Sequence, residues 1–336
     1  MVNKKQYTVI SIFAGGGGSS LGYHLNGFKE LLAIDCDSNS CETLRANFVF
    51  PVWEKDIKEI TIKEILKFCK IKTGELDILD GSPPCQGFSI VRKRKIDDER
   101  NDLFKEYIRF IVGLQPKVFI MENVPGMMRG IMKGKFNEIL FSLKLLDYNV
   151  KVKLMNAMWY EVPQNRERLF FIGIRKDFNI EPSFPDPIKR VITVKEALQG
   201  CPMGLSDGEF TGERLELSLR IKPGGIGKNY DKGSSRCLRK LAWNRPSATI
   251  LKSVGRTKSS FGNGLIHPHF NRHLTIAELK RVSSFPDDYK FIGKFREQWA
   301  RIGNSVMPKM MYHIVKNIKI NFLDKYSNKG RIHNYS

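Results

Sequence analysis

The chain has no C-x-x-C pair among its six cysteines, no apolar run long enough to cross a bilayer and no internal repeat. The scattered thiols argue against a disulfide framework and indicate an intracellular protein with reduced cysteines. The missing apolar run argues against a membrane-spanning protein. With 336 residues, of which 41% are hydrophobic and 27% charged, the chain is long enough for one large and one small domain, each with a buried core.

Acidic residues are also scarce, above all in the second half. The whole chain has 35 Asp and Glu residues against 56 Lys and Arg residues, which gives a net charge of +21. Residues 201–336 contain 25 of the basic but only 10 of the acidic side chains, so this part alone carries +15. Such an excess predicts a polyanionic partner, most commonly nucleic acid. An anionic membrane surface is the alternative, but the sequence contains no basic amphipathic anchor.

Short β-branched and aromatic runs alternate with segments of helical period up to about residue 178. This alternation predicts an α/β fold with a doubly wound, mostly parallel, Rossmann-like sheet. Residues 179–297 are rich in Pro, Gly and Ser and predict a second, smaller and irregular basic domain. Helical pattern returns at residues 298–322, which we expect to complete the first domain of residues 1–178. Residues 323–336 predict a flexible tail.

A glycine cluster, FAGGGGSSLG, follows the first predicted strand. Glycine at a strand-to-helix turn lets a ligand approach the backbone closely. No register of the cluster satisfies the dinucleotide fingerprint G-x-G-x-x-G. Asp35 ends the second strand about 20 residues further on, where an acidic side chain can accept the hydroxyls of a ribose. Asp56 follows a third strand, where it could read an adenine amino group. In this order the signals predict an adenosine-containing cofactor at the carboxyl edge of the sheet.

Three further stretches fall at predicted strand ends. GSPPCQGFS, with Cys85, follows LDILD; Glu122 follows KVFIM; Arg166 and Arg168 precede LFFIGI. One thiol, one carboxyl group and two cations at the edge where α/β sheets bind ligands indicate a reactive site. Each group also has an ordinary alternative: a buried thiol in a turn, a helix cap, and two arginines paired with neighbouring glutamates.

Taken together, these stretches resemble the C5-cytosine DNA methyltransferases that use S-adenosylmethionine, of the prokaryotic or viral modification type. The matching segments run nearly end to end in the family's order: SIFAGGGGSSLG, KDI, GSPPCQGFS, RNDLF, ENVPG, PQNRERLFFIG, RPSATI, HLTIAELKRVSSFPDDY and ARIGNSVMP. The resemblance implies a catalytic domain with a mixed sheet, a small target-recognition domain within residues 179–297, and a C-terminal helix that returns to the large domain. Ser11 and Asp35 stand where many relatives have Asp and Glu, which bears on cofactor affinity.

The resemblance also implies a chemical role for each residue of the reactive site. Cys85 would add as a thiolate to C6 of a flipped-out cytosine, which makes C5 nucleophilic. Glu122 would protonate N3, Arg168 would hold O2, and Arg166 would support Glu122 or the ring. Water would remove the C5 proton before Cys85 is eliminated. S-adenosylmethionine would donate the methyl group and leave as S-adenosylhomocysteine, and the chemistry needs no metal.

The resemblance also implies which residues contact the cofactor and which contact DNA. The cofactor is expected to meet residues of the glycine loop, the strand ends and the C-terminal motif: Phe13, Ala14, Gly15, Gly17, Gly18, Asp35, Cys36, Asp56, Ile57, Pro83, Leu103, Asn304, Ser305 and Val306. Duplex DNA is expected to meet a basic loop behind the thiol and parts of the small domain: Ser89, Arg92, Lys93, Arg94, Lys95, Gly224, Gly225 and Arg239. The alternatives are a solvated charge run for residues 92–95 and a plain turn for the glycine pair.

Three further possibilities are a metal site at a histidine cluster, a different methyltransferase substrate and a protein without catalytic activity. His267, His269 and His273 lack the spacing of a metal site, so we predict no metal. A transfer-RNA cytosine methyltransferase would use the same chemistry, but the Cys-Phe-Thr tripeptide of that branch does not occur. A catalytically silent DNA-binding regulator would be expected to have lost the thiol or the acid. Because the chain lacks the long regulatory N-terminus of multidomain eukaryotic relatives, we expect a stand-alone modification enzyme of a bacterium, archaeon, phage or virus, with or without a separate restriction endonuclease. We also expect the enzyme to be a monomer in the cytoplasm that associates with the nucleoid through DNA.

Overall fold

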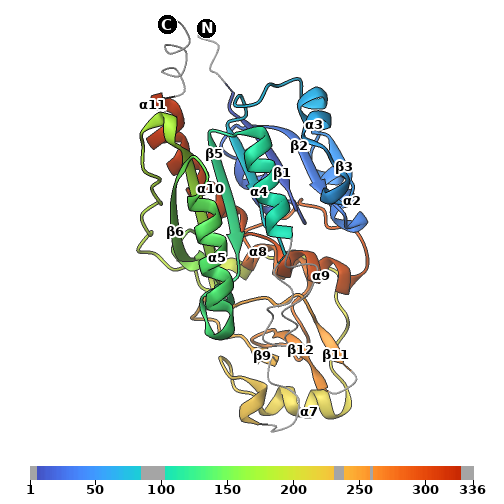
Figure 1. Ribbon diagram of the computed structural model, residues 1–336. Helices are drawn as coiled ribbons and strands as arrows, with labels where there is room; N and C mark the ends of the chain where they lie inside the picture. The colour runs from blue at the N-terminus through green and yellow to red at the C-terminus, as the bar shows by residue number, and fades with distance from the viewer. Residues whose placement is uncertain (1–5, 85–102, 231–237, 258–259, 327–336) are drawn as a thin grey trace, which may run out of the picture.

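The computed structural model describes residues 6–84, 103–230, 238–257 and 260–326. Its centre is a seven-stranded sheet in the order β3-β2-β1-β4-β5-β8-β6, in which β8 runs antiparallel to both neighbours and the other pairs are parallel (Figure 1). The strands are β1 (Thr8–Ile12), β2 (Lys29–Asp35), β3 (Val52–Glu54), β4 (Ile78–Gly81), β5 (Val118–Asn123), β6 (Tyr148–Asn156) and β8 (Glu167–Arg175). The predicted α/β fold with a mostly parallel sheet is confirmed.

Helices cover both faces of this sheet, and alternating side chains explain why. Val9 and Ile78 point into one core with α1 and α10, whereas Ile10 and Leu79 point into the opposite core with α3, α4 and α5. A sheet buried on both faces needs apolar residues at nearly every position of its central strands, as TVISI and VFIM provide. The helices are α1 (Gly18–His24), α2 (Ser38–Asn47), α3 (Ile62–Cys69), α4 (Leu103–Leu114), α5 (Lys133–Lys144) and α10 (Pro308–Ile318).

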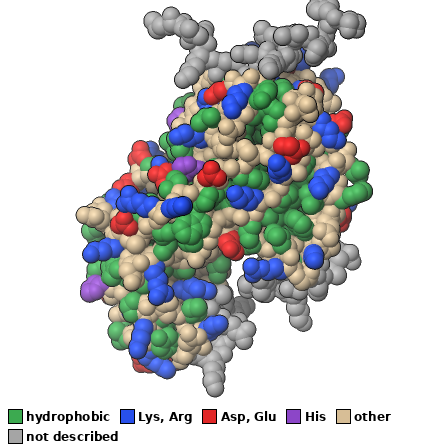
Figure 2. Space-filling model, turned by 90° about the vertical axis from the view of Figure 1, so that its left-hand side faces the viewer, with side chains coloured by type: hydrophobic (Ala, Val, Ile, Leu, Met, Phe, Trp, Pro, Cys, Tyr) green, Lys and Arg blue, Asp and Glu red, His purple; other side chains and the backbone are tan. Residues whose placement is uncertain are grey.

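A smaller lobe lies below the large sheet in Figure 1. It contains a three-stranded sheet in the order β11-β12-β9 and has one apolar cluster of its own, while a second cluster also includes Leu21 of α1. Figure 2 shows more Lys and Arg than Asp and Glu side chains on this lower part of the molecule. The helices and strands in and next to this lobe are α6 (Val194–Leu198), α7 (Gly212–Arg220), β9 (Leu238–Lys240), β11 (Gly255–Thr257), β12 (Ser260–Ile266), α8 (Ile276–Val282) and α9 (Phe295–Asn304). A separate pair of short strands is formed by β7 (Gln164–Asn165) and β10 (Ser247–Ala248).

The C-terminal helix returns to the large sheet and continues further than the sequence suggested. A π-helical turn (Lys319–Leu323) and α11 (Asp324–Tyr326) follow α10, and the side chain of Leu323 is fully buried. The Tyr7 hydroxyl donates a hydrogen bond to Asp324 at 2.9 Å. The packed chain therefore extends past residue 323, where the tail was predicted to begin. Within the described ranges, no helix is long and apolar enough to cross a membrane.

The glycine cluster at the start of α1 serves two different purposes. A Cβ atom on Gly18 would lie 2.0 Å from the Val306 carbonyl oxygen, and one on Gly22 would lie 2.7 Å from Met311 Cβ. These two glycines therefore let α1 pack directly against α10 and the segment before it. Gly15, in contrast, has φ +55° and nothing within 4 Å of its Cβ position. Gly15 is the member of this cluster that leaves room for a ligand.

Two buried carboxyl groups hold α1 on the sheet. Tyr23 donates its hydroxyl to Asp80 on β4 at 3.2 Å, and Ser20 donates to Glu30 on β2 at 3.0 Å. Burial raises the pKa of Asp80 to about 7 and that of Glu30 to about 8, because the charged form of a carboxyl group is poorly solvated there. Both groups therefore bind a proton in the folded protein at a pH where they are ionised in the unfolded chain.

We expect Gly18→Ala to cost at least about 2 kcal/mol of unfolding free energy, because the new methyl group meets a backbone carbonyl that cannot rotate away. Gly15→Ala should cost only roughly 1 kcal/mol, the penalty for an L-residue at positive φ. Urea unfolding of the two variants measures both values. Equal losses would show that the close approach of α1 to Val306 does not constrain the fold.

The buried acids predict a stability that declines as the pH rises. Their folded pKa values lie above the unfolded values near 4, so their contribution is complete below pH 4 and is lost as the pH rises to about 7 for Asp80 and 8 for Glu30. The slope is at most about 1.4 kcal/mol per pH unit for each group. Urea unfolding at pH 5, 7 and 9 should show this decline in the parent and a flatter profile in Glu30→Gln/Asp80→Asn. If the double variant kept the pH profile of the parent, the raised pKa values of Asp80 and Glu30 would be contradicted.

Candidate active site

The carboxyl ends of the neighbouring strands β4 and β5 meet at one edge of the large sheet. β4 ends at Gly81 and leads into Pro83, while β5 carries Glu122 and Asn123 at its end. The Asn123 side chain donates a hydrogen bond to the Pro83 carbonyl oxygen at 3.3 Å, which ties the Pro-Pro segment to β5. Cys85 follows two residues later and lies outside the described residues. The Pro-Pro segment that precedes the predicted thiol in the sequence therefore lies beside the strand that carries the predicted acid.

Glu122 forms an ion pair with Arg168, in which Arg168 Nε lies 2.8 Å from Glu122 Oε1. Both side chains are only about a tenth exposed, at 11% and 12%. Burial lowers the pKa of Arg168, and the Glu122 carboxylate opposes that shift. The guanidinium also donates to the Glu167 carbonyl oxygen at 2.7 Å, so both its position and that of the carboxylate are fixed. Arg168 thus pairs with the predicted acid rather than with a neighbouring glutamate on its own segment.

Arg166 has a different environment from Arg168, although the two lie only two residues apart. Its side chain is fully buried and donates to three backbone carbonyl oxygens: Ile250 at 3.0 Å, Gly303 at 2.7 Å and Ser305 at 3.2 Å. Burial lowers its pKa well below the usual value, and the nearby Arg168 cation adds to this. The sequence suggested that Arg166 supports Glu122 or the base. Its hydrogen bonds join β8 to the small lobe and to the segment before α10.

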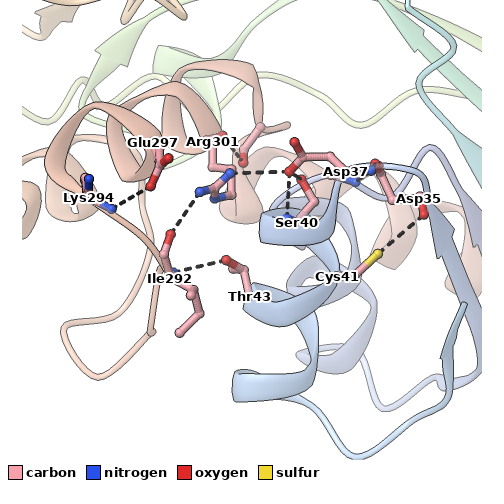
Figure 3. A network of polar contacts seen from close by, with 11 residues as sticks. Asp35, Asp37, Ser40, Cys41, Thr43, Ile292, Lys294, Glu297 and Arg301 are labelled. Carbon is pink, nitrogen blue, oxygen red and sulfur yellow. Dashed lines mark hydrogen bonds and ion pairs between the residues drawn. The ribbon is translucent and has the colours of Figure 1, made fainter. Parts of the chain in front are cut away.

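The candidate cofactor side lies at the end of β2. Asp35 accepts hydrogen bonds from the backbone N–H groups of Gly15 at 2.7 Å and Asp37 at 2.9 Å. Burial raises the pKa of Asp35, and the backbone donors oppose this. Phe13 and Gly15 both have positive φ, which turns the loop sharply between β1 and α1. Figure 3 shows Asp35 and Asp37 beside the first turn of α2.

The other residues predicted to meet the cofactor divide by exposure. Asn304 and Cys36 are exposed and accessible, as is Asp56, which accepts a hydrogen bond from Lys58 N–H at 3.0 Å and so caps a short helical turn. Ser305 and Val306 are instead buried beneath the glycine loop. Four further members are also buried: Gly17, Gly18, Ile57 and Pro83. The last two members, Ala14 and Leu103, are half-buried.

The predicted DNA contacts in the small lobe lie on its surface. Gly224 is exposed with φ +82°, and its N–H donates to the Lys240 carbonyl oxygen at 2.9 Å. Gly225 N–H donates to Lys222 at 2.8 Å, so the glycine pair forms a turn. Arg239 is exposed on β9. The basic loop, comprising Ser89, Arg92, Lys93, Arg94 and Lys95, lies outside the described residues.

The histidine cluster is occupied by contacts within the small lobe. His273 lies 2.8 Å from Asp207 and also contacts Arg214, while His267 lies 3.6 Å from Glu278. Burial lowers the pKa of His267 to about 4, with Glu278 opposing the shift. Among the residues that the structure describes, no group of three or more His, Cys, Asp or Glu side chains could hold a metal ion.

An adenosine-containing methyl donor fits the residues at this edge. Gly15 leaves open space beside the carboxylate of Asp35, and Asn304 is exposed at the junction that follows α9. These groups offer carboxylate and amide partners for ribose hydroxyls and for a charged amino-acid end. One residue of this edge that the sequence did not single out is Arg301. Its position in the C-terminal motif, three residues before Asn304, was the available signal.

Known proteins share both the sequence and the fold. A family model described as C-5 cytosine-specific DNA methylase matches residues 7–320. The Type II methyltransferase M1.HphI of Haemophilus parahaemolyticus is 33% identical over 333 residues, which cover 93% of this chain and 86% of that protein. M.NgoFVII of Neisseria gonorrhoeae, also a Type II methyltransferase, is 31% identical over 339 residues, which cover 95% and 88%.

Solved structures agree with this assignment. A protein encoded within an Escherichia coli prophage and described as a DNA modification methyltransferase has a TM-score of 0.77 and 26% identity, covering 95% of this chain and all of that one. The Dnmt2 methyltransferase of S. pombe has a TM-score of 0.67 at 15% identity, with 94% and 99% covered, and shares the fold. With the family model matching residues 7–320 and relatives above 30% identity over most of their length, the chain belongs to the C-5 cytosine-specific DNA methylase family.

Proposed function

We propose that this enzyme methylates C5 of a flipped-out cytosine in a specific duplex DNA sequence through a covalent bond between Cys85 and C6. The observation that carries the proposal is the buried Glu122–Arg168 pair at the end of β5, next to the Pro-Pro segment that leads into Cys85. A rigid segment suits a nucleophile, because the attack geometry tolerates little displacement. Arg168 and Glu122 supply fixed polar groups where the ring must accept charge.

The proposed steps use groups of this chain at named atoms. Glu122 first takes up a proton from solvent on Oε2. Cys85, as a thiolate, then forms a bond to C6 while Glu122 gives that proton to N3 of the ring. Arg168 holds Glu122 through Oε1 and faces O2, which leaves Oε2 for N3. S-adenosylmethionine, when bound near Gly15 and Asp35, supplies the methyl group. The C5 proton then passes to water, the C6–S bond breaks with return of the thiolate, and N3 gives its proton back to Glu122.

The small basic lobe is the proposed DNA target-recognition domain. Swinging a base out of a duplex costs a few kcal/mol, which contacts to the flanking phosphates can offset. The charge of +15 on residues 201–336 suits such contacts. Because the relatives include Type II methyltransferases, we also propose a modification role, alone or beside a separate restriction endonuclease, for a monomer that leaves S-adenosylhomocysteine as product.

Bisulfite sequencing of DNA from cells that express the protein tests the function. We expect protected cytosines at one recurrent sequence with the parent and none with Cys85→Ser, because only the nucleophile has changed. Duplex DNA that carries 5-fluorocytosine at that sequence should remain covalently attached to Cys85, since the C5 fluorine cannot leave as a proton does. An adduct mapped to another cysteine would refute the assignment of Cys85.

The DNA contacts predict a strong salt dependence. The logarithm of the non-specific binding constant should fall with the logarithm of the salt concentration by about 0.9 for each phosphate neutralised. Replacing Arg92, Lys93, Arg94 and Lys95 with glutamine should reduce this slope and slow turnover but leave the preferred sequence unchanged, because phosphate contacts position without specifying. Fluorescence anisotropy at four salt concentrations measures the slope. An unchanged slope and rate would identify the basic run as solvated surface.

A further inference from the structure

The chain between α8 and α9 is fastened to α2 by a series of polar contacts (Figure 3). Ile292 N–H donates to the Thr43 hydroxyl at 3.2 Å. Asn47 exchanges two hydrogen bonds with the backbone of Lys290, at 2.7 and 2.8 Å. Because α8 and α9 pack in the apolar cluster of the small lobe, this segment is a direct physical connection between that lobe and α2.

Arg301 on α9 is the charged member of this connection. Its side chain is only 8% exposed, and it donates to Asp37 Oδ1 at 3.3 Å and to the Ile292 carbonyl oxygen at 2.9 Å. Asp37 Oδ1 also accepts hydrogen bonds from the N–H and the hydroxyl of Ser40, so Asp37 is the N-cap of α2. Burial lowers the pKa of Arg301, and the Asp37 carboxylate offsets part of that effect.

Arg301 also lies next to the glycine loop. A Cβ atom on Gly16 would lie 3.5 Å from Arg301 Cβ and 3.1 Å from the Ser305 hydroxyl oxygen. That hydroxyl donates to the Arg301 carbonyl oxygen at 2.8 Å. Arg301 thus binds the turn after β2 and neighbours the loop after β1, and these two segments are the walls of the candidate cofactor site.

Asp35 lies between these two walls. One carboxylate oxygen accepts the N–H of Gly15 in the loop, and the other accepts the N–H of Asp37 in the turn. A change in the separation of loop and turn would therefore alter the position of the Asp35 carboxylate. The cation of Arg301 restrains this separation through Asp37, while its backbone restrains it through Ser305.

We propose that Arg301 is a positioning residue for the methyl donor, which sets the spacing between the glycine loop and the first turn of α2 through its ion pair with Asp37. This inference rests on the proposed function, in which Asp35 binds the ribose. Arg301 acts through Asp37 and Asp35 and does not touch the reacting atoms. The ion pair is partly exposed, since the Asp37 side chain is 55% accessible, so the expected effect is moderate.

The test measures the binding of S-adenosylhomocysteine to the full chain by calorimetry. Arg301→Gln and Asp37→Asn should each weaken binding about three- to tenfold, and the double variant should be no weaker than the worse single one, because both remove the same pair. Asn is as good an N-cap as Asp, so Asp37→Asn keeps the α2 cap while removing the charge. In steady-state assays KM for the donor should rise while kcat at saturation stays within twofold.

Arg45→Gln is the matched control. Arg45 lies on α2, at the opposite end of that helix from Asp37, and forms an exposed ion pair with Glu54 at 3.4 Å. It should bind S-adenosylhomocysteine like the parent, and Arg301→Lys should recover part of the lost affinity. Binding within twofold of the parent in both Asp37→Asn and Arg301→Gln would overturn the inference. A parent protein that fails to bind S-adenosylhomocysteine would instead refute the proposed function.

Discussion

The hydrogen bonds of the buried Arg166 guanidinium connect three parts of the molecule that are distant in sequence. Ile250 belongs to the small lobe, Gly303 lies in the last turn of α9, and Ser305 begins the segment that leads to α10. A charge with no exposure is stable only where such acceptors surround it, so the three carbonyl groups must converge. Once they do, Ser305 and Val306 lie against the glycine loop and α10 covers the sheet. The site depends on this convergence.

The charged groups at the edge of the sheet differ in burial and in the partners that hold them. Arg166 serves the fold, Arg168 fixes Glu122, and Asp35 is held by backbone N–H groups while remaining half-buried. Asp80 and Glu30, deeper beneath α1, have raised pKa values because they are buried, and they hold that helix through hydrogen bonds from Tyr23 and Ser20. Hydrogen bonds and ion pairs within the protein thus fix the groups around Glu122, an arrangement that would lower the cost of reorganisation in the proposed reaction.

The small lobe and the large sheet are physically joined on both sides of the site. Arg166 and the β7–β10 pair make the connection near Glu122, and the segment from Lys290 to Arg301 makes it near Asp35. The His267 and His273 side chains lie within the lobe at 3.6 Å from Glu278 and 2.8 Å from Asp207, respectively. The lobe that we propose to recognise DNA and the edge that we propose to bind the methyl donor are therefore parts of one continuous framework.

The sequence alone determined the α/β class and the order of the strands along the chain, and it supplied the residues that we propose to be reactive, because strand periodicity and motifs such as GSPPCQGFS and ENVPG are local. It also placed Asp35 and Glu122 at strand ends correctly. Only the tertiary structure decided that Gly18 and Gly22 accommodate a returning helix while Gly15 faces open space, that adjacent arginines have separate partners, and that residues up to Tyr326 pack on the sheet. These features depend on contacts between residues up to 317 positions apart, which no local pattern records.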